Sequence, residues 1–285
     1  MEKIDRLRWE AGIILTAYGL SIGVRVSDRS VLEQIYALLP PGWRPATKPT
    51  VRRLYSVIVG GPTARAGVRR FNILYSGAAR LARAHDLDEV LRHLELDLEL
   101  YIGDNARRRT FVHAGVVGWN GQAIVIPGRS FSGKSSLVKA LVKAGADYYS
   151  DEFAVLDERG RVHPYPIPLA IRQDRDGGQP VKCRVEDLGG VVGTRPLPVG
   201  LVLFTRYVGG ARFRPRRLSV GRGVLELLTH TLAARRGPEQ VLDTLTQAVG
   251  QALVVRGARG DAEETARQLL GSDLFGREHS APMIA

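Results

Sequence analysis

Residues 128–135, GRSFSGKS, combine glycines, a lysine and a serine at the spacing that phosphate binding requires. Glycines let the backbone turn tightly and bring its N–H groups close to anionic oxygens. Lys134 can reach the outer phosphates of a nucleotide, and the Ser135 hydroxyl can ligate Mg²⁺. The pattern G-x-x-x-x-G-K-S/T predicts a nucleotide site formed by Gly128, Arg129, Ser130, Phe131, Ser132, Gly133, Lys134, Ser135 and Ser136.

The segments on either side of this stretch have the patterns of a strand and a helix. Residues 122–127, QAIVIP, are a short β-branched run typical of a buried strand. Residues 135–146, SSLVKALVKAGA, place apolar side chains on one helical face, and Gly145 lies where a C-cap glycine belongs. Strand, glycine loop and helix form the frame of a phosphate site, since a helix N-terminus attracts phosphate. A glycine-rich turn that binds nothing is the disfavoured alternative.

Two acidic residues follow this helix at the point where the chain is expected to leave a strand. In-line phosphoryl transfer needs one group to orient the acceptor hydroxyl and cations to neutralise the γ-phosphate. Asp151 can do the first, and Glu152 can hold a metal ion directly or through water. A second interpretation gives Asp151 only a role in binding Mg²⁺. The expected metal ligands are Ser135, Asp151 and Glu152.

Two hairpins should position these residues. Asn120 and Gly121 supply the positive φ angles of a tight turn, which predicts a hairpin immediately before the glycine loop. The second is expected from residues 148–157 and a proline-rich return, with its turn at residues 158–160. Residues 166–196 predict a long loop that could cover the site. A buried strand (197–207) and three helices (223–232, 239–255 and 261–276) are expected to follow.

The first third of the chain contains no motif that we can connect to chemistry. Its patterns predict strands within residues 11–27, 52–60, 68–77 and 81–86, and a helix over 31–39 capped by Asp28 or Ser30. A longer helix should begin after Asp86 or Asp88, with a stripe formed by Leu87, Leu91, Leu94 and Leu98. We therefore expect a small α+β domain that ends near Asn105 and serves substrate or partner recognition.

Composition restricts the remaining possibilities. The chain has 285 residues, a formal net charge of +12 and a single cysteine, Cys183, so neither an intramolecular disulfide nor a cysteine-based metal cluster is possible. We see no secretion signal and no apolar run long enough for a membrane span, and we expect a cytoplasmic protein. Residues 188–225 are rich in arginine, and a solvated basic face competes with an anion-binding surface there. Nucleic acid is not an expected partner.

Three features resemble the catalytic domain of the bacterial HPr kinase/phosphorylase superfamily, more closely the HPr kinase-related group. A histidine followed by a small residue and a glycine (residues 113–115, HAG) lies in the strand before the loop. The phosphate loop leads into a helix that ends in glycine, and residues 150–152, SDE, are similar to that family's Ala-Asp-Asp stretch. The resemblance covers residues 107–170 well and the rest of the chain in outline.

The resemblance implies roles for individual residues. The first acid of the pair is the catalytic base for a serine hydroxyl in that family, which corresponds to Asp151, and the histidine beside the phosphates corresponds to His113. A core histidine hydrogen-bonded within the hairpin is the alternative for His113. Arg172 is a candidate phosphate or substrate contact. The family's later signature loop is not found here, so the resemblance does not extend to HPr itself as the substrate or to phosphorylase activity.

We therefore expect an α/β fold with an HPr-kinase-like P-loop domain over residues 106–275. A small α+β domain over residues 1–105 should precede it, and a flexible tail over 276–285 should follow. The expected function is a kinase that uses ATP and Mg²⁺ and phosphorylates a serine- or threonine-type hydroxyl of a protein, peptide or small molecule. Its expected catalytic residues are Asp151, His113 and Lys134. The alternative is a non-catalytic nucleotide-binding regulatory protein or an ATPase. HPr kinases are hexameric, so the resemblance also favours a homo-oligomer.

Overall fold

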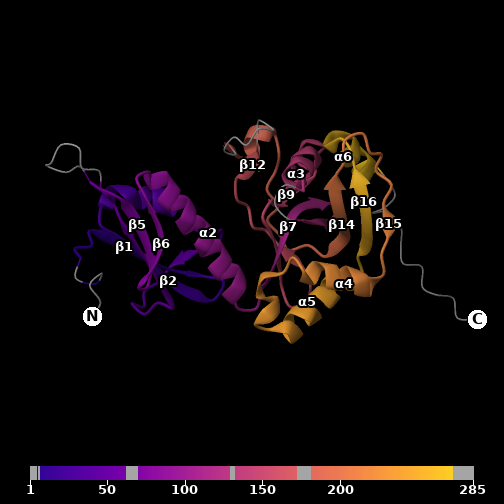
Figure 1. The fold of residues 1–285 in the computed structure, drawn as a ribbon. Coiled ribbons are helices and arrows are strands. Elements are labelled where there is room, and N and C mark those ends of the chain that lie inside the picture. The colour runs from indigo at the N-terminus through magenta and orange to yellow at the C-terminus, as the bar shows by residue number, and fades with distance from the viewer. Residues whose placement is uncertain (1–4, 6, 62–69, 129–131, 172–180, 272–285) are drawn as a thin grey trace, which may run out of the picture. The chain divides into compact units, whose positions relative to one another are not determined.

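The computed structural model describes residues 5, 7–61, 70–128, 132–171 and 181–271, and the chain forms two compact units, Met1–Arg108 and Arg109–Ala285. Both units combine sheets with helices, so the fold class is mixed α/β (Figure 1). Within the described residues, no helix has the length and apolar character that a membrane crossing requires.

The first unit contains a six-stranded sheet in the order β3-β1-β2-β4-β5-β6. Neighbouring strands are antiparallel except β2 and β4, which are parallel. The strands expected from the alternating apolar patterns in this third of the chain are confirmed. Their bounds are β1 Ala11–Ala17, β2 Leu20–Val26, β3 Arg44–Pro45, β4 Arg53–Ile58, β5 Asn72–Ser76 and β6 Ala79–Ala84.

The long helix of this unit, α2 (Leu87–Asn105), begins at Asp86, whose Oδ1 accepts a hydrogen bond of 3.1 Å from the Asp88 N–H. Its expected leucine stripe is buried at three of four positions, and Leu87 is half-buried. The shorter helix differs from its prediction. A 3-10 turn over Arg29–Val31, capped by Asp28, precedes α1 (Leu32–Tyr36), so regular helix ends before the expected residue 39.

The second unit contains an eight-stranded sheet in the order β11-β10-β7-β8-β14-β16-β15, with β9 also paired to β7. Strands β8, β14 and β16 are parallel, whereas β7 is antiparallel to β8, β9 and β10. The strands are β7 Thr110–Trp119, β8 Gln122–Pro127, β9 Asp147–Ser150, β10 Phe153–Leu156, β11 Val162–His163, β14 Val199–Tyr207, β15 Arg216–Arg217 and β16 Leu253–Arg259.

Helices cover both faces of this sheet (Figure 1). Helices α3 (Lys134–Lys143) and α6 (Ala262–Gly271) pack on a face that includes Leu203 and Val255. Helices α4 (Val220–Leu228) and α5 (Pro238–Gly250) pack on the opposite face, which includes Phe204 and Val254. The division follows from strand geometry, because successive side chains point to opposite faces. Strands buried on both faces explain the continuous apolar runs in the sequence.

Both expected hairpins are present. Asn120 and Gly121 have φ angles of 49° and 75° between β7 and β8, as an Asn-Gly turn requires. The second hairpin joins β10 to β11, and Gly160 in its turn has a φ of 73°. Its first strand is not continuous as expected, because the chain breaks between β9 and β10. The Ser150 hydroxyl forms this break by accepting hydrogen bonds from the N–H groups of Glu152 and Phe153, at 3.2 and 3.0 Å.

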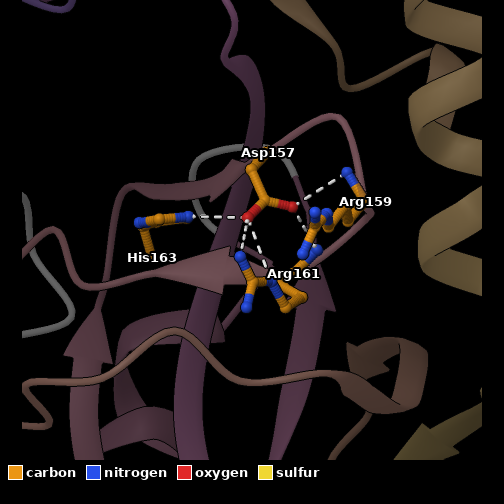
Figure 2. A network of polar contacts seen from close by, with 4 residues as sticks. All are labelled: Asp157, Arg159, Arg161 and His163. Atoms are coloured by element: carbon orange, nitrogen blue, oxygen red, sulfur yellow. Dashed lines mark hydrogen bonds and ion pairs between the residues drawn. The ribbon is translucent and has the colours of Figure 1, made fainter.

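The turn of the second hairpin is held by a polar network around Asp157 (Figure 2). Asp157 Oδ1 accepts hydrogen bonds of 3.0 Å from the N–H groups of Arg159 and Arg161. Its Oδ2 accepts from the Arg161 side chain and lies 2.9 Å from His163 Nε2. The network anchors the carboxyl end of β10, the strand whose amino end follows Asp151 and Glu152.

Two expectations about the second unit are wrong. The helix expected over residues 239–255 ends at Gly250, and its last apolar residues instead start β16, where Val254 and Val255 pair with Val202 and Leu203 of β14. Residues 166–196 are not simply a loop, because β12 (Leu169–Ile171) and β13 (Val181–Cys183) form a two-stranded antiparallel sheet. β-Branched side chains favour a strand once a neighbouring strand is available.

Candidate functional site

The expected phosphate loop joins the end of β8 to the start of α3. Gly133 is the N-cap residue of α3 and has a φ of 82°, a conformation that favours glycine. A Cβ atom on Gly128 would lie 2.6 Å from Ser132 Oγ, so a larger residue there would require the Ser132 side chain to move. Among the expected nucleotide-binding residues, Arg129, Ser130 and Phe131 lie outside the described residues, as does Arg172.

Lys134 is the first residue of α3, and its side chain is almost completely buried. Its Nζ lies 3.0 Å from His113 Nε2. Burial lowers the pKa of Lys134, and the negative charges of Glu152 and Asp151 oppose that effect. Water screens charges little at this site, so the ammonium group interacts strongly with the charged groups around it.

His113 lies on β7 beside the break between β9 and β10, where it pairs with Phe153 in the β ladder. Its Nε2 is 3.0 Å from Glu152 Oε1 and also 3.0 Å from Lys134 Nζ. One ring nitrogen cannot serve both partners at once, since it donates when protonated and accepts when it carries a lone pair. His113 can therefore exchange between a carboxylate partner and an ammonium partner.

Asp151 lies in the break between β9 and β10 and is only 4% exposed. Its Oδ1 has no hydrogen-bond partner among the described residues. Burial raises the pKa of Asp151 to about 6, although a hydrogen bond with Ser135 and the charge of Lys134 act in the opposite direction. A buried carboxylate oxygen without a partner, with a pKa near neutrality, has the properties of a general base.

Glu152 differs from Asp151 although the two are adjacent. Burial would raise its pKa, but the hydrogen bond from His113 and the charges of His113 and Lys134 outweigh burial, so the pKa of Glu152 is lowered. Its side chain is 39% exposed. Glu152 therefore remains ionised and accessible, as a metal-binding carboxylate must be, whereas Asp151 is buried and poised to take a proton.

Gly115 explains how α3 approaches β7 closely enough to bring these groups together. A Cβ atom at this position would lie 2.5 Å from Val138 Cγ2 and 3.1 Å from Lys134 Cγ. It would also be 3.7 Å from Asp151 Oδ1. The glycine of the sequence HAG is therefore required by packing, since any side chain would push α3 and Lys134 away from the strand.

The structure thus gathers five of the expected site residues: His113, Lys134, Ser135, Asp151 and Glu152. Within the described part of the chain, no group of three or more His, Cys, Asp and Glu side chains could hold a metal ion. Mg²⁺ needs no such cage, because it usually binds one or two carboxylates together with substrate phosphates. Metal binding by Ser135, Asp151 and Glu152 stays a prediction.

Arg259 is a site residue that the sequence patterns did not indicate. It is the last residue of β16 and is 1% exposed, and its Nη2 donates a hydrogen bond to the carbonyl oxygen of Gly133. The sequence holds no distinct signal for Arg259, because it follows the apolar run 252–255 only after Arg256 and Gly257. Its contact with Gly133 depends on the strand β16, where a helix was expected over residues 239–255.

The sequence matches no known protein-family model, and comparison with the curated proteins finds no significant match. The assignment of a function therefore rests on the motifs and on the geometry of this cluster.

Proposed function

We propose that the chain is an ATP- and Mg²⁺-dependent phosphotransferase with an HPr-kinase-like P-loop domain. It transfers the γ-phosphoryl group of ATP to a serine- or threonine-type hydroxyl of a protein, a peptide or a small molecule. The observation that carries the proposal is that a buried lysine at the start of α3 lies near Asp151, whose buried Oδ1 has no hydrogen-bond partner among the described residues. A site for phosphate and a site for the acceptor proton thus adjoin each other.

The binding half of the proposal rests on the start of α3. The helix N-terminus, the left-handed Gly133 and the Lys134 ammonium all favour an anion at the end of the glycine loop. Ser135 follows in the first turn and interacts with Asp151. Bound Mg²⁺ would supply positive charge to the phosphate oxygens, held by Ser135 and by Asp151 or Glu152.

The chemical half rests on Asp151. Its Oδ1 accepts the proton of the acceptor hydroxyl while the oxygen of that hydroxyl forms a bond to the γ-phosphorus. The bond between the γ-phosphorus and the bridging oxygen breaks, and ADP leaves with the electron pair. Lys134 compensates the charge on the transferred group. A phosphate that attracts the Lys134 ammonium away from His113 leaves His113 Nε2 free to donate a hydrogen bond to Glu152. This hydrogen bond keeps the Glu152 carboxylate oriented.

Transfer of label from γ-labelled ATP, with Mg²⁺ present, tests the proposal in wild type and in Asp151→Asn. Free serine, serine-containing peptides and a cell extract serve as acceptors, and Asp147→Asn is the control because Asp147 is an exposed acid on β9. We expect label on one acceptor class in the wild type and the control, and loss of at least about 100-fold in Asp151→Asn. ATP binding without transfer to any acceptor would favour the non-catalytic regulatory alternative.

A further inference from the structure

The carbonyl groups of Ser132 and Gly133, just before α3, accept hydrogen bonds from the last residues of the parallel strands β14 and β16. The Ser132 oxygen accepts a hydrogen bond of 3.4 Å from the N–H of Tyr207, the last residue of β14. The Gly133 oxygen accepts one from Arg259 Nη2 at the end of β16. These contacts connect the loop to strands far away in the sequence.

These contacts, together with the hydrogen bond of 3.2 Å that the Leu137 N–H donates to the Gly133 oxygen, orient the N–H groups at the start of α3. A trans peptide group is planar and its C=O and N–H point in opposite directions. Holding the oxygens of Ser132 and Gly133 toward β14 and β16 therefore directs the N–H groups of Gly133 and Lys134 away from them. These belong to the first N–H groups of a helix, which have no partner within the helix and are available to an anion.

Arg259 is an unusual residue for a purely structural contact. It is 1% exposed, its Nη1 donates to the Gly260 carbonyl at 3.1 Å, and its Nε has no partner among the described residues. The Tyr207 ring lies beside it, with the Cζ atom 5.8 Å from the ring centroid. The hydrogen bonds of its guanidinium go to neutral carbonyl groups, and burial disfavours its charge, which the carboxylate of the exposed Asp261 favours. An anion bound at the start of α3 would compensate this charge.

We propose that Arg259 is a positioning residue of the nucleotide site, which fixes the Gly133–Lys134 peptide group and contributes buried positive charge beneath the nucleotide phosphates. This inference rests on the proposed function, since it assumes that phosphates bind at the start of α3. Two constraints favour glycine at position 133. Its φ is 82°, and a Cβ atom there would collide with the Arg259 guanidinium. The loop, β14 and β16 thus form one support for the phosphates.

The test compares ADP binding by the wild type, Arg259→Lys and Arg259→Met, measured by titration calorimetry together with thermal unfolding of each protein. Methionine removes the charge at similar length, and lysine keeps the charge but cannot donate to two carbonyls in a fixed fork. We expect ADP to bind about 10- to 100-fold more weakly to Arg259→Met, the loss for one charge-assisted hydrogen bond, with a smaller loss in Arg259→Lys. Arg256→Met, an exposed arginine on the same strand, should bind ADP like the wild type.

The outcomes separate this inference from the proposed function. A wild-type chain that binds neither ADP nor ATP contradicts the proposed function. Wild-type affinity in a folded Arg259→Met, with a change only in unfolding temperature, would leave the proposed function intact and show Arg259 to be merely structural.

If Arg259→Lys and Arg259→Met both fail to fold, amide hydrogen exchange of the wild-type chain with and without ADP tests the inference. We expect ADP to slow exchange both in the first turn of α3 and at the end of β16. Slowing confined to α3 would overturn the inference.

Discussion

His113 Nε2 lies 3.0 Å from Lys134 Nζ, joining a strand residue of the hairpin to the first residue of the helix that follows the loop. The same nitrogen lies 3.0 Å from Glu152 Oε1, so one imidazole is shared between the group expected to bind phosphate and a group expected to bind metal. The side chain is half-buried, and both of these partners of its ring lie outside the β7–β8 hairpin. The alternative of a core histidine hydrogen-bonded within that hairpin therefore does not describe His113.

Replacement of His113 should affect transfer more than nucleotide binding. In His113→Gln the loop and Lys134 remain, while the hydrogen bond that helps keep the pKa of Glu152 low is weakened. We expect kcat to fall about 10- to 100-fold, as for the loss of an electrostatic contact in an active site. The ADP dissociation constant should change by less than about threefold. Weakened ADP binding with normal kcat would show instead that His113 acts on the phosphates alone.

The pH dependence of transfer should follow the ionisation of Asp151. Burial raises the pKa of this carboxyl to about 6, and only the ionised form can accept a proton. We therefore expect kcat/KM, which reports the free enzyme, to fall tenfold per pH unit below about pH 6 and to level off above it. The measurement is a profile between pH 5 and pH 8 at constant ionic strength. A profile that is flat through pH 6 would contradict the role of Asp151 as base.

Gly115→Ala should move helix α3 away from strand β7, which carries His113. The added methyl group would meet Val138 and Lys134, so we expect a loss of about 1–3 kcal/mol in the free energy of unfolding together with loss of ATP binding. Urea unfolding and nucleotide titration measure the two effects.

Gly221→Ala is the matched control for this substitution, because no atom of the described residues lies within 4 Å of a Cβ atom on that glycine of α4. It should stabilise the protein by about 0.4–1 kcal/mol. If Gly115→Ala behaved like this control, the proposed close packing of α3 on β7 would be wrong.

Asp157 should contribute stability that disappears in acid. Although burial opposes ionisation, hydrogen bonds from His163 and Arg161 outweigh it and lower the pKa of Asp157 to about 2. The folded pKa is below the ordinary value of 3.8, so the contribution is complete above pH 3.8 and is lost as the pH falls toward 2. Asp157→Asn should therefore cost roughly 2 kcal/mol at pH 7, and less as the pH approaches 2. Urea midpoints at pH 7 and pH 3 measure this, and an equal cost at both would contradict it.

Local sequence signals predicted those features that depend on a few neighbouring residues. The Asn120 and Gly121 turn and the Asp86 cap follow from conformational preferences that short peptides already have. The strand β8 and the helix α3 on either side of the glycine-rich segment were predicted for the same reason, because their apolar patterns are local.

Features that depend on distant residues were not predicted. Val254 and Val255 continue the apolar pattern of α5, and only the presence of β14 as a partner makes them a strand. Arg259 is the last residue of that strand, so its contact with Gly133 could not be predicted without β16. The need for glycine at position 115 likewise comes from Val138, a residue of α3.

The most direct test of the account measures ATP binding and phosphoryl transfer in the same samples of the wild type and Asp151→Asn. A single turnover of bound, γ-labelled ATP is followed after an acceptor is added. We predict that both proteins bind ATP and that only the wild type moves the label to a hydroxyl. Transfer by Asp151→Asn at the wild-type rate would show that Asp151 is not the base. Bound ATP that stays intact in the wild type with every acceptor would contradict the assignment as a phosphotransferase.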